Sequence, residues 1–145
     1  TLDPDTAHPR LALSPDGRSV SWGDTRRAVP DHPKRFDSSR CVLGTEGFSS
    51  GRHYWEVWVA RGATWAVGVA KESVPRKGRV SIKPEGGIWA VGQCGGQCQA
   101  LTCPAVPIRL PQAPEVVGVY LDYEEGRGAF FDGRRGVPMF AYPPA

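Results

Sequence analysis

Apolar and polar positions alternate in short runs along the chain, and glycine or proline interrupts each run. No long stretch carries the 3.6-residue apolar period of an amphipathic helix, whereas the two-residue alternation of strands recurs. The pattern predicts short β-strands at residues 11–13, 19–22, 41–43, 53–59, 64–70, 88–91, 99–101, 116–123, 129–132 and 139–142. Many short strands of this spacing are typical of an all-β sandwich or barrel, so we expect helix to be nearly absent.

Two of the predicted strands are apolar on both faces and are expected near the centre of the core, at residues 64–70 and 116–121. Gly68 in the first predicts a β-bulge or the close approach of another backbone. The proline-rich link from Pro104 to Pro114 is expected to be extended. Turn signals separate the strands at Ser14-Pro15-Asp16-Gly17, Arg61-Gly62, Pro84-Glu85-Gly86-Gly87, Glu125-Gly126 and Asp132-Gly133.

The alternation within residues 53–59 assigns side chains to the two faces of one strand. The set expected in the core is His53, Trp55, Val57 and Val59, and the opposite set is Tyr54, Glu56 and Trp58. Trp58 is then either covered by a neighbouring segment or exposed. An exposed Trp on a sheet is a candidate contact residue, because Trp is enriched at the centres of interfaces.

Composition fits a single soluble domain: 145 residues, 40% hydrophobic and 23% charged. The net charge of +3 comes from small scattered clusters beside turn residues, which are interpreted as solvated loop tips. A nucleic-acid surface would need a continuous basic stripe with stacking aromatics, so no nucleic-acid partner is expected. The chain has no apolar run of the length that spans a bilayer and no signal peptide at its start, so we expect no direct membrane binding. Because the first residue is Thr1, we expect a piece of a longer protein.

The four cysteines are Cys41, Cys94, Cys98 and Cys103. The spacing of the last three invites a zinc interpretation, but structural zinc prefers C-x2-C knuckles and no fourth ligand stands nearby. Reduced thiols in a cytosolic domain are the favoured interpretation, and no metal or cofactor is expected.

Residues 47–51 read G-F-S-S-G and match the G-x-S-x-G string of a serine-hydrolase nucleophile elbow. An elbow needs a helix after its serine, and here an aromatic, strand-like segment follows Ser49. His53 is too close in the chain to serve as the base, so we interpret the string as a Gly/Ser turn. Asp122 and Glu124 share a strand face and are interpreted as acids that cap a strand end or a turn.

Several segments stand out along the chain: Leu2-Asp3-Pro4-Asp5-Thr6-Ala7-His8-Pro9, Arg35-Phe36-Asp37, Cys41-Val42-Leu43-Gly44, Gly47-Phe48-Ser49-Ser50-Gly51-Arg52-His53-Tyr54-Trp55-Glu56-Val57, Trp65-Ala66-Val67-Gly68-Val69, Arg76-Lys77-Gly78 and Leu121-Asp122-Tyr123-Glu124. Together and in this order they resemble the PRY-SPRY domain of tripartite-motif ubiquitin ligases, butyrophilins and pyrin, and the resemblance covers essentially the whole chain. The resemblance implies a bent β-sandwich of two antiparallel sheets. It also implies a PRY segment at 1–46 and a SPRY segment at 47–145 within one compact domain, with the final strand of the family missing or truncated.

The resemblance further implies a binding surface made by variable loops and the strand edges between them. The residues expected to contact a partner are Arg26, Arg27, Ala66, Arg79, Gln93, Cys94 and Gln97. Residues 92–94 are Gly-Gln-Cys where relatives place gripping aromatics, which suggests a small polar pocket suited to a short peptide or a chain terminus. Trp55 and Trp65 are expected to pack the core, and Asp122 to hold a turn.

The function expected from this resemblance is non-catalytic recognition of a protein or short peptide. The chain would be the substrate-binding domain of a cytoplasmic tripartite-motif ubiquitin ligase, whose RING domain lies outside it and whose coiled coil makes it oligomeric. A role in innate immunity is expected at the family level. The alternative is the cytoplasmic ligand-sensing domain of a butyrophilin-like receptor, and a distant alternative is a serine hydrolase that uses Ser49.

Overall fold

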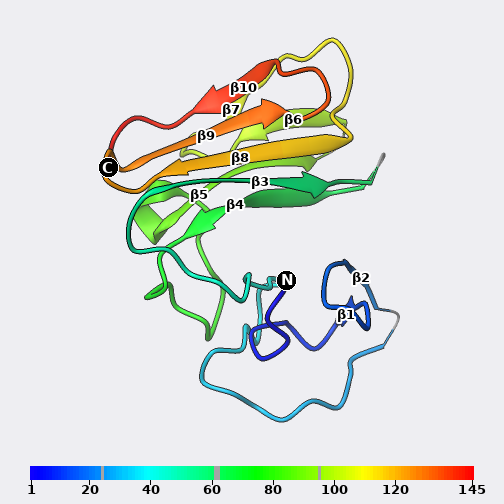
Figure 1. The fold of residues 1–145 in the computed structure, drawn as a ribbon. Coiled ribbons are helices and arrows are strands. Elements are labelled where there is room, and N and C mark those ends of the chain that lie inside the picture. The colour runs from blue at the N-terminus through cyan, green and yellow to red at the C-terminus, as the bar shows by residue number, and fades with distance from the viewer. Residues whose placement is uncertain (24, 61–62, 95) are drawn as a thin grey trace. The chain divides into compact units, whose positions relative to one another are not determined.

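The computed structural model describes residues 1–23, 25–60, 63–94 and 96–145 (Figure 1). The chain divides into two compact units. The N-terminal unit comprises Thr1–Gly47 and Glu72–Ser81, and the C-terminal unit comprises Phe48–Lys71 and Ile82–Ala145. The assignment of 1–46 and 47–145 to a PRY and a SPRY segment of one domain stays a prediction. The turn predicted at Arg61-Gly62 lies outside the described residues.

The N-terminal unit contains one hairpin and is otherwise built from turns. Strand β1 (Leu11–Leu13) pairs with β2 (Val20–Trp22), and the predicted turn at residues 14–17 joins them. An isolated antiparallel bridge links Leu2 to Gly44. The buried interior of the unit consists of Thr6, Ala7, His8, Leu11, Arg35, Phe36 and Val74.

Residues 72–81 belong to this unit because they are bonded to residues 31–39. The Arg76 guanidinium lies 5.5 Å from the centre of the Phe36 ring and donates a hydrogen bond to the Lys34 carbonyl at 2.9 Å. The Gly78 N–H donates to the Asp37 carboxylate at 2.8 Å. The ammonium of Lys77 pairs with the Asp31 carboxylate at the same distance.

The first sheet of the C-terminal unit has the strand order β10-β9-β8-β3 and is antiparallel throughout. Its strands are β3 (Arg52–Trp58), β8 (Val116–Asp122), β9 (Arg127–Asp132) and β10 (Pro138–Ala141). The β3 side chains alternate between half-buried and exposed, as the predicted two-face pattern requires. The β8 strand is buried over most of its length, in agreement with its apolar sequence.

The second sheet is also antiparallel, with the order β4-β5-β6-β7. Its strands are β4 (Trp65–Ala70), β5 (Ile88–Cys94), β6 (Gln97–Ala100) and β7 (Val106–Pro107). A single 3-10 turn, η1 (Pro84–Gly86), precedes β5. Gly87 closes it in the left-handed conformation, with φ at 86°, where glycine costs least.

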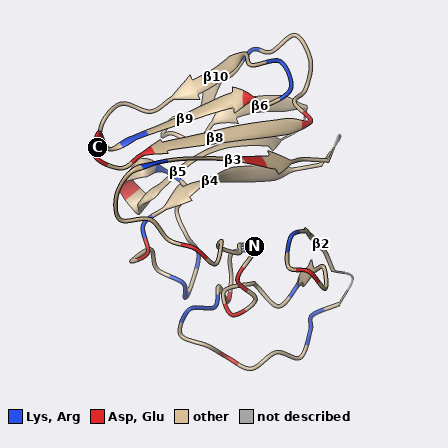
Figure 2. Cartoon of the chain, viewed as in Figure 1, with Lys and Arg blue, Asp and Glu red and all other residues tan. Residues whose placement is uncertain are grey.

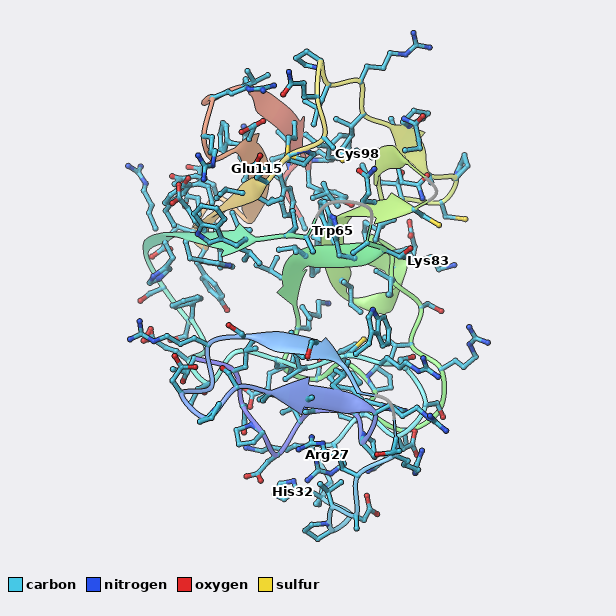
Figure 3. All side chains as sticks on the ribbon, turned by 90° about the vertical axis from the view of Figure 1, so that its right-hand side faces the viewer. Arg27, His32, Trp65, Lys83, Cys98 and Glu115 are labelled. Carbon is cyan, nitrogen blue, oxygen red and sulfur yellow. The ribbon has the colours of Figure 1, made fainter. Side chains whose placement is uncertain are left out.

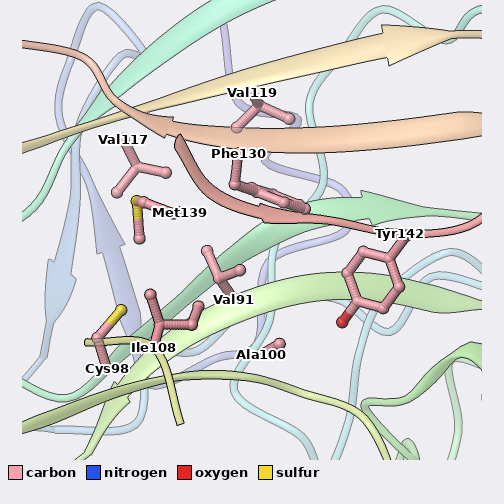
Figure 4. Close-up of a cluster of buried hydrophobic side chains, with 9 residues drawn as sticks. All are labelled: Val91, Cys98, Ala100, Ile108, Val117, Val119, Phe130, Met139 and Tyr142. Carbon is pink, nitrogen blue, oxygen red and sulfur yellow. The ribbon is translucent and has the colours of Figure 1, made fainter. Parts of the chain in front are cut away.

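The hydrophobic core lies between these two sheets (Figure 4). Val91 and Ala100 enter it from one sheet, and Val117, Val119 and Phe130 from the other, all with almost no exposure. Tyr142 joins the layers as well, because its hydroxyl donates a hydrogen bond to the Ala90 carbonyl at 2.7 Å. The predicted all-β sandwich of two antiparallel sheets is therefore confirmed.

One strand prediction was wrong. Residues 41–43 form no strand, because the facing residues 3–8 fold into turns and offer only scattered bonds, such as the Asp3 N–H to the Leu43 carbonyl at 2.8 Å. The proline-rich link at 104–114, which was predicted to be extended, contributes β7 to a sheet edge. Proline is tolerated there because an edge strand leaves N–H positions unused.

Candidate functional site

The outward face of the β4-β5-β6 sheet collects several of the residues that were predicted to contact a partner. Trp65 and Cys98, labelled in Figure 3, belong to the sides of β4 and β6 that pack in the sandwich. Since side chains alternate along a strand, Ala66 and Gln97 lie on the other side. Cys94 lies opposite Gln97 in the β5–β6 pairing and therefore shares that side.

Strand register places these residues in neighbouring rows. Ala66 lies opposite Gly92, and Gly92 lies opposite Gln99, so these three form one row across three strands. Cys94 and Gln97 form the next row, and opposite residues in a sheet stand close enough for their side chains to touch. We call this set the recognition face: Ala66, Gly92, Cys94, Gln97 and Gln99.

Gly92 keeps the centre of the recognition face low. A Cβ atom added there would stand 2.9 Å from the Trp65 carbonyl oxygen and 3.3 Å from the Leu101 Cδ1 atom. Both distances are tighter than ordinary contacts, so the backbone geometry favours glycine at this position. Gly92 is itself buried, with the Leu101 side chain against it, and the exposed Ala66 beside it adds little side-chain bulk.

Around that low centre the recognition face is neutral and able to form hydrogen bonds. The thiol of Cys94 and the side chain of Gln97 are exposed, and Gln99 is half-buried. The side-chain amide N–H of Gln97 donates to the Cys98 carbonyl at 3.1 Å. The Oε1 atom of Gln97 is a hydrogen-bond acceptor that a ligand could use. Such a surface can bind a backbone or an amide, but it offers no acid, base or nucleophile pair.

Gln93 does not join this face. It lies opposite Trp65 and Cys98 and so points to the core side of β5, where its Oε1 atom is buried without a hydrogen-bond partner among the described residues. The residue is half-buried, and its contact with a ligand stays a prediction. The glutamine that does point outward is Gln99 of β6, which lies opposite Gly92 and was not among the predicted contact residues.

The predicted contact arginines all lie in the N-terminal unit. Arg26 and Arg27 follow β2 and are exposed, and the Arg27 backbone N–H donates to the Pro9 carbonyl at 2.9 Å. Arg79 is also exposed and lies in the 72–81 segment.

The three residues expected to be structural have structural surroundings. Trp55 and Trp65 are half-buried and pack against the core between the sheets. Asp122 is buried: its carboxylate accepts the Glu125 N–H at 3.2 Å and pairs with Arg52 at 3.3 Å.

Glu124 has a similar role at the same end of β3, where the strand begins. Its carboxylate accepts the Gly51 N–H from both oxygens, at 2.8 and 2.9 Å. The shallow pocket lined by Gly51, Arg52, Asp122, Glu124 and Glu125 is therefore occupied by acids that already hold turns.

Ser49 lies in a bend, and the segment after it enters strand β3 rather than a helix. His53 stacks on Phe48 with ring centres 3.9 Å apart, and its Nε2 atom is 2.7 Å from the Ser50 carbonyl oxygen. The imidazole is thus held by a ring and a backbone group, and the geometry of a nucleophile elbow is not present around Ser49.

All four cysteines are free thiols, and Cys41 and Cys98 have their thiol pKa raised by burial. Among residues 1–23, 25–60, 63–94 and 96–145, no three His, Cys, Asp or Glu side chains are grouped to hold a metal ion. Within the same described ranges, no helix is long and apolar enough to cross a bilayer.

A second outward face, on the β3 side of the other sheet, exposes aromatic side chains. Trp58 is 69% exposed, and the Arg134 guanidinium lies 4.7 Å from the centre of its ring. Tyr54 is also exposed and donates a hydrogen bond to the Glu56 carboxylate at 2.9 Å. Of the two possibilities for Trp58, the structure shows the exposed one.

Two protein-family models match successive parts of the chain. The SPRY domain model matches residues 52–141, and the PRY model, described as a SPRY-associated domain, matches residues 1–48.

Curated relatives agree with the family models. The chain is 51% identical over 133 residues to erythroid membrane-associated protein of Mus musculus, covering 91% of this chain and 24% of that protein. It is 44% identical over 142 residues to the E3 ubiquitin-protein ligase TRIM58 of Homo sapiens, covering 97% and 29%. It is 49% identical over 142 residues to human butyrophilin subfamily 2 member A2, covering 98% and 27%. The chain thus spans less than a third of each of these relatives.

Solved structures share the fold at lower identity. The TRIM65 PSpry domain has a TM-score of 0.81 and 24% identity, covering 99% of this chain and 76% of that one. A stonustoxin structure has the same TM-score with 23% identity, covering 99% of this chain and 24% of that one. The two-sheet sandwich agrees with the matched family models and with the relatives. Together they show that the chain belongs to the SPRY domain family and carries the SPRY-associated PRY segment before the SPRY domain.

Proposed function

We propose that this chain is a non-catalytic module that binds a protein or a short peptide through the recognition face. The observation that carries the proposal is the row Ala66–Gly92–Gln99, where side-chain bulk is minimal in the middle and amides stand beside it. A peptide backbone can approach such a surface closely. The neighbouring amides and the thiol then meet its N–H and carbonyl groups without opposing charges.

The proposed context is substrate recognition in a tripartite-motif ubiquitin ligase. In that case the ligase chemistry and the coiled coil lie in a longer cytoplasmic protein, and Arg26, Arg27 and Arg79 of the N-terminal unit stay predicted contact residues by themselves. The name of TRIM58 supports this context, and the names of the butyrophilins support the alternative of a receptor's cytoplasmic domain equally. A role in innate immunity has only the family resemblance in its favour.

The recognition face is tested with peptides selected from a random display library on the wild-type chain. Ala66→Arg places a long cation on the face from an exposed strand position, and Ala141→Arg makes the same change on an exposed position of β10. We expect Ala66→Arg to weaken binding of the selected peptides by at least about tenfold, equal to about 1.4 kcal/mol, and Ala141→Arg to leave it unchanged.

Fluorescence anisotropy gives both affinities, and Gln99→Ala against Gln112→Ala gives a second matched pair without added bulk. Equal losses in both members of each pair would place the peptide elsewhere and refute this face as the site.

The catalytic alternative is tested separately with a fluorophosphonate probe for activated serines. We expect no labelling of Ser49, because the imidazole of His53 is held by Phe48 and the Ser50 carbonyl. Labelling that Ser49→Ala abolishes would support a hydrolase.

A further inference from the structure

Backbone hydrogen bonds draw separate stretches of the N-terminal unit together around residues 8–10. The bonds run from the Gly23 N–H to the Arg10 carbonyl (2.8 Å), from the Arg27 N–H to the Pro9 carbonyl (2.9 Å) and from the His8 N–H to the Cys41 carbonyl (3.1 Å). Each stretch carries an arginine: Arg10 itself, Arg26 next to Arg27, and Arg40 next to Cys41. The backbone at three arginines from distant parts of the sequence is thus brought together around residues 8–10.

Among the described residues of the unit, no ion pair involves the guanidinium groups of these arginines. The ion pairs of the described residues are Arg52–Asp122, Lys77–Asp31 and Arg134–Glu115, and none of them includes Arg10, Arg26 or Arg40. The Asp37 carboxylate, which is close in sequence to Arg40, accepts the Gly78 N–H instead. Figure 2 shows Lys and Arg, interspersed with Asp and Glu, along the loops of this unit, whereas the sheet ribbons of the other unit are mostly uncharged.

The charges of these arginines act on the buried His8. Its pKa is lowered by burial first and then by the charges of Arg26 and Arg40, with a smaller effect of Arg10. Its Nδ1 atom accepts the Arg10 backbone N–H at 3.0 Å, so the imidazole is neutral in the folded unit. The three guanidinium groups therefore act on one point, as a cluster would.

An exposed indole lies within the same cluster. Trp22 ends β2, pairs with Leu11 beside Arg10, and is 54% exposed. The Arg40 guanidinium lies 5.3 Å from the centre of its ring, a cation–π distance. The surface thus combines positive charge with apolar area, which a simple solvated loop does not need.

We propose that Arg10, Arg26, Arg40 and Trp22 form a binding site for an acidic peptide segment of a protein partner. In this basic site, Asp or Glu carboxylates pair with the guanidinium groups and an apolar side chain of the partner packs on Trp22. The proposal goes beyond the recognition face, because it concerns other residues, the other unit and an anionic ligand.

The apolar ring beside the charges favours a peptide over a simple anion. The exposed Trp22 ring lies 5.3 Å from the Arg40 guanidinium and offers a contact that an apolar side chain of a peptide can use and a phosphate cannot. Nucleic acid would need a longer basic stripe with several stacking aromatics, and this cluster has one exposed indole. Charge complementarity with an acidic segment also accounts for the absence of carboxylates paired to these three arginines among the described residues.

The test uses a fluorescein-labelled peptide of repeating Glu-Glu-Leu, with repeating Gln-Gln-Leu as the neutral probe. Arg26→Ala with Arg40→Ala removes two charges from the basic site. Arg18→Ala with Arg109→Ala removes the same charge from exposed positions outside it. We expect the first pair to weaken binding of the acidic peptide about tenfold at low salt and the second pair less than twofold. Trp22→Ala should weaken it as well, and the neutral peptide should not bind.

His8 provides a second readout that a loss of folding would not imitate. A bound carboxylate offsets the guanidinium charges, so the imidazole pKa measured by NMR should rise when the acidic peptide is added to the wild-type chain. Arg26→Ala with Arg40→Ala should raise the same pKa without peptide. The proposal is overturned by equal losses in both double variants, by peptide binding that leaves the His8 pKa unchanged, or by phosphatidylserine vesicles or duplex DNA binding where the peptide does not.

Discussion

At the scale of single residues, Gly68 shows how closely the sandwich is packed. The sequence predicted a bulge or a close backbone approach there, and the structure has the approach: β4 and β5 stay in regular register, and an added Cβ would overlap the Trp89 carbonyl oxygen and the Ala90 backbone. A backbone cannot move aside as a flexible side chain can. The position therefore excludes every residue except glycine unless the two strands separate.

We expect Gly68→Ala to lower the free energy of unfolding by about 2–3 kcal/mol, since overpacking forces the two strands to shift. Gly128→Ala is the matched control, because an added Cβ there meets nothing within 4 Å in the described residues. It should leave the free energy of unfolding unchanged or slightly raised. Urea denaturation of both variants checks the prediction, and equal effects would refute the packing explanation.

His8 makes the N-terminal unit sensitive to acid. Its folded-state pKa lies below the ordinary 6.5, so as pH falls the unfolded chain takes up the proton before the folded unit does. The stability that the neutral imidazole provides is therefore complete above pH 6.5 and is lost as pH falls from there toward the lowered pKa. Protonation of Nδ1 would also break the bond from the Arg10 N–H.

We expect amide hydrogen exchange in the N-terminal unit to accelerate between pH 7.5 and 5.5, after correction for the intrinsic rate. His8→Asn keeps an acceptor near the Nδ1 position without titrating, and should flatten this dependence. His32→Gln serves as the control that retains it. A slope that persists in His8→Asn would assign the acid sensitivity to another group.

At the scale of elements, the β9–β10 hairpin depends on one buried carboxylate. The Asp132 Oδ1 atom accepts the N–H groups of Arg134 at 3.0 Å and Arg135 at 3.1 Å. The backbone of the same residue bonds to Val137 and Gly136, both at 2.8 Å. Asp132, the last residue of β9, therefore fixes the turn through both its side chain and its backbone.

Asp132→Ala should lower the free energy of unfolding by about 1–3 kcal/mol, because it leaves two turn N–H groups without their acceptor. Asp132→Asn keeps a carbonyl oxygen in place and should cost clearly less. Thermal unfolding followed by circular dichroism separates the two variants. If they unfold alike, the charge rather than the turn bonds is what matters.

At the scale of the whole molecule, the N-terminal unit is discontinuous in sequence. Residues 72–81 return to it after β3 and β4 have entered the other unit, and Arg76 and Lys77 bond to residues 31–34. Replacing 72–81 with a Gly/Ser linker should remove hydrogen-exchange protection from the N-terminal unit and preserve it at Val91 and Val119 of the sandwich core. Loss of protection in both units would show that they fold as one.

Much of the fold could be predicted from the sequence, because alternation is a local signal. It placed β3, β4 and β8 to within about two residues, the usual uncertainty of element ends. It failed at residues 41–43, where a β-prone Cys-Val-Leu faces turns rather than a strand. The sequence of a segment does not show whether another strand will lie beside it and pair with it.

The candidate site was harder to predict, because it depends on register. The sequence pointed to Ala66, Cys94 and Gln97, which share a face, but also to Gln93, which the β5 alternation turns toward the core. The Gly-Gly pair between Cys94 and Gln97 is a two-residue hairpin signal that would have fixed the pairing and selected Gln99. The arginines around His8 gave no such signal, since backbone bonds between distant segments bring them together.

The return of residues 72–81 also sets an order of events during synthesis. A ribosome makes Thr1–Gly47 first, and the stretch that binds Asp31, Lys34 and Asp37 is translated only after two strands of the sandwich. Residues 1–47 therefore remain incompletely bonded until residues 72–81 have been made. During that interval residues 1–47 are available to chaperones. Their folding is completed only after residues 72–81 have been translated.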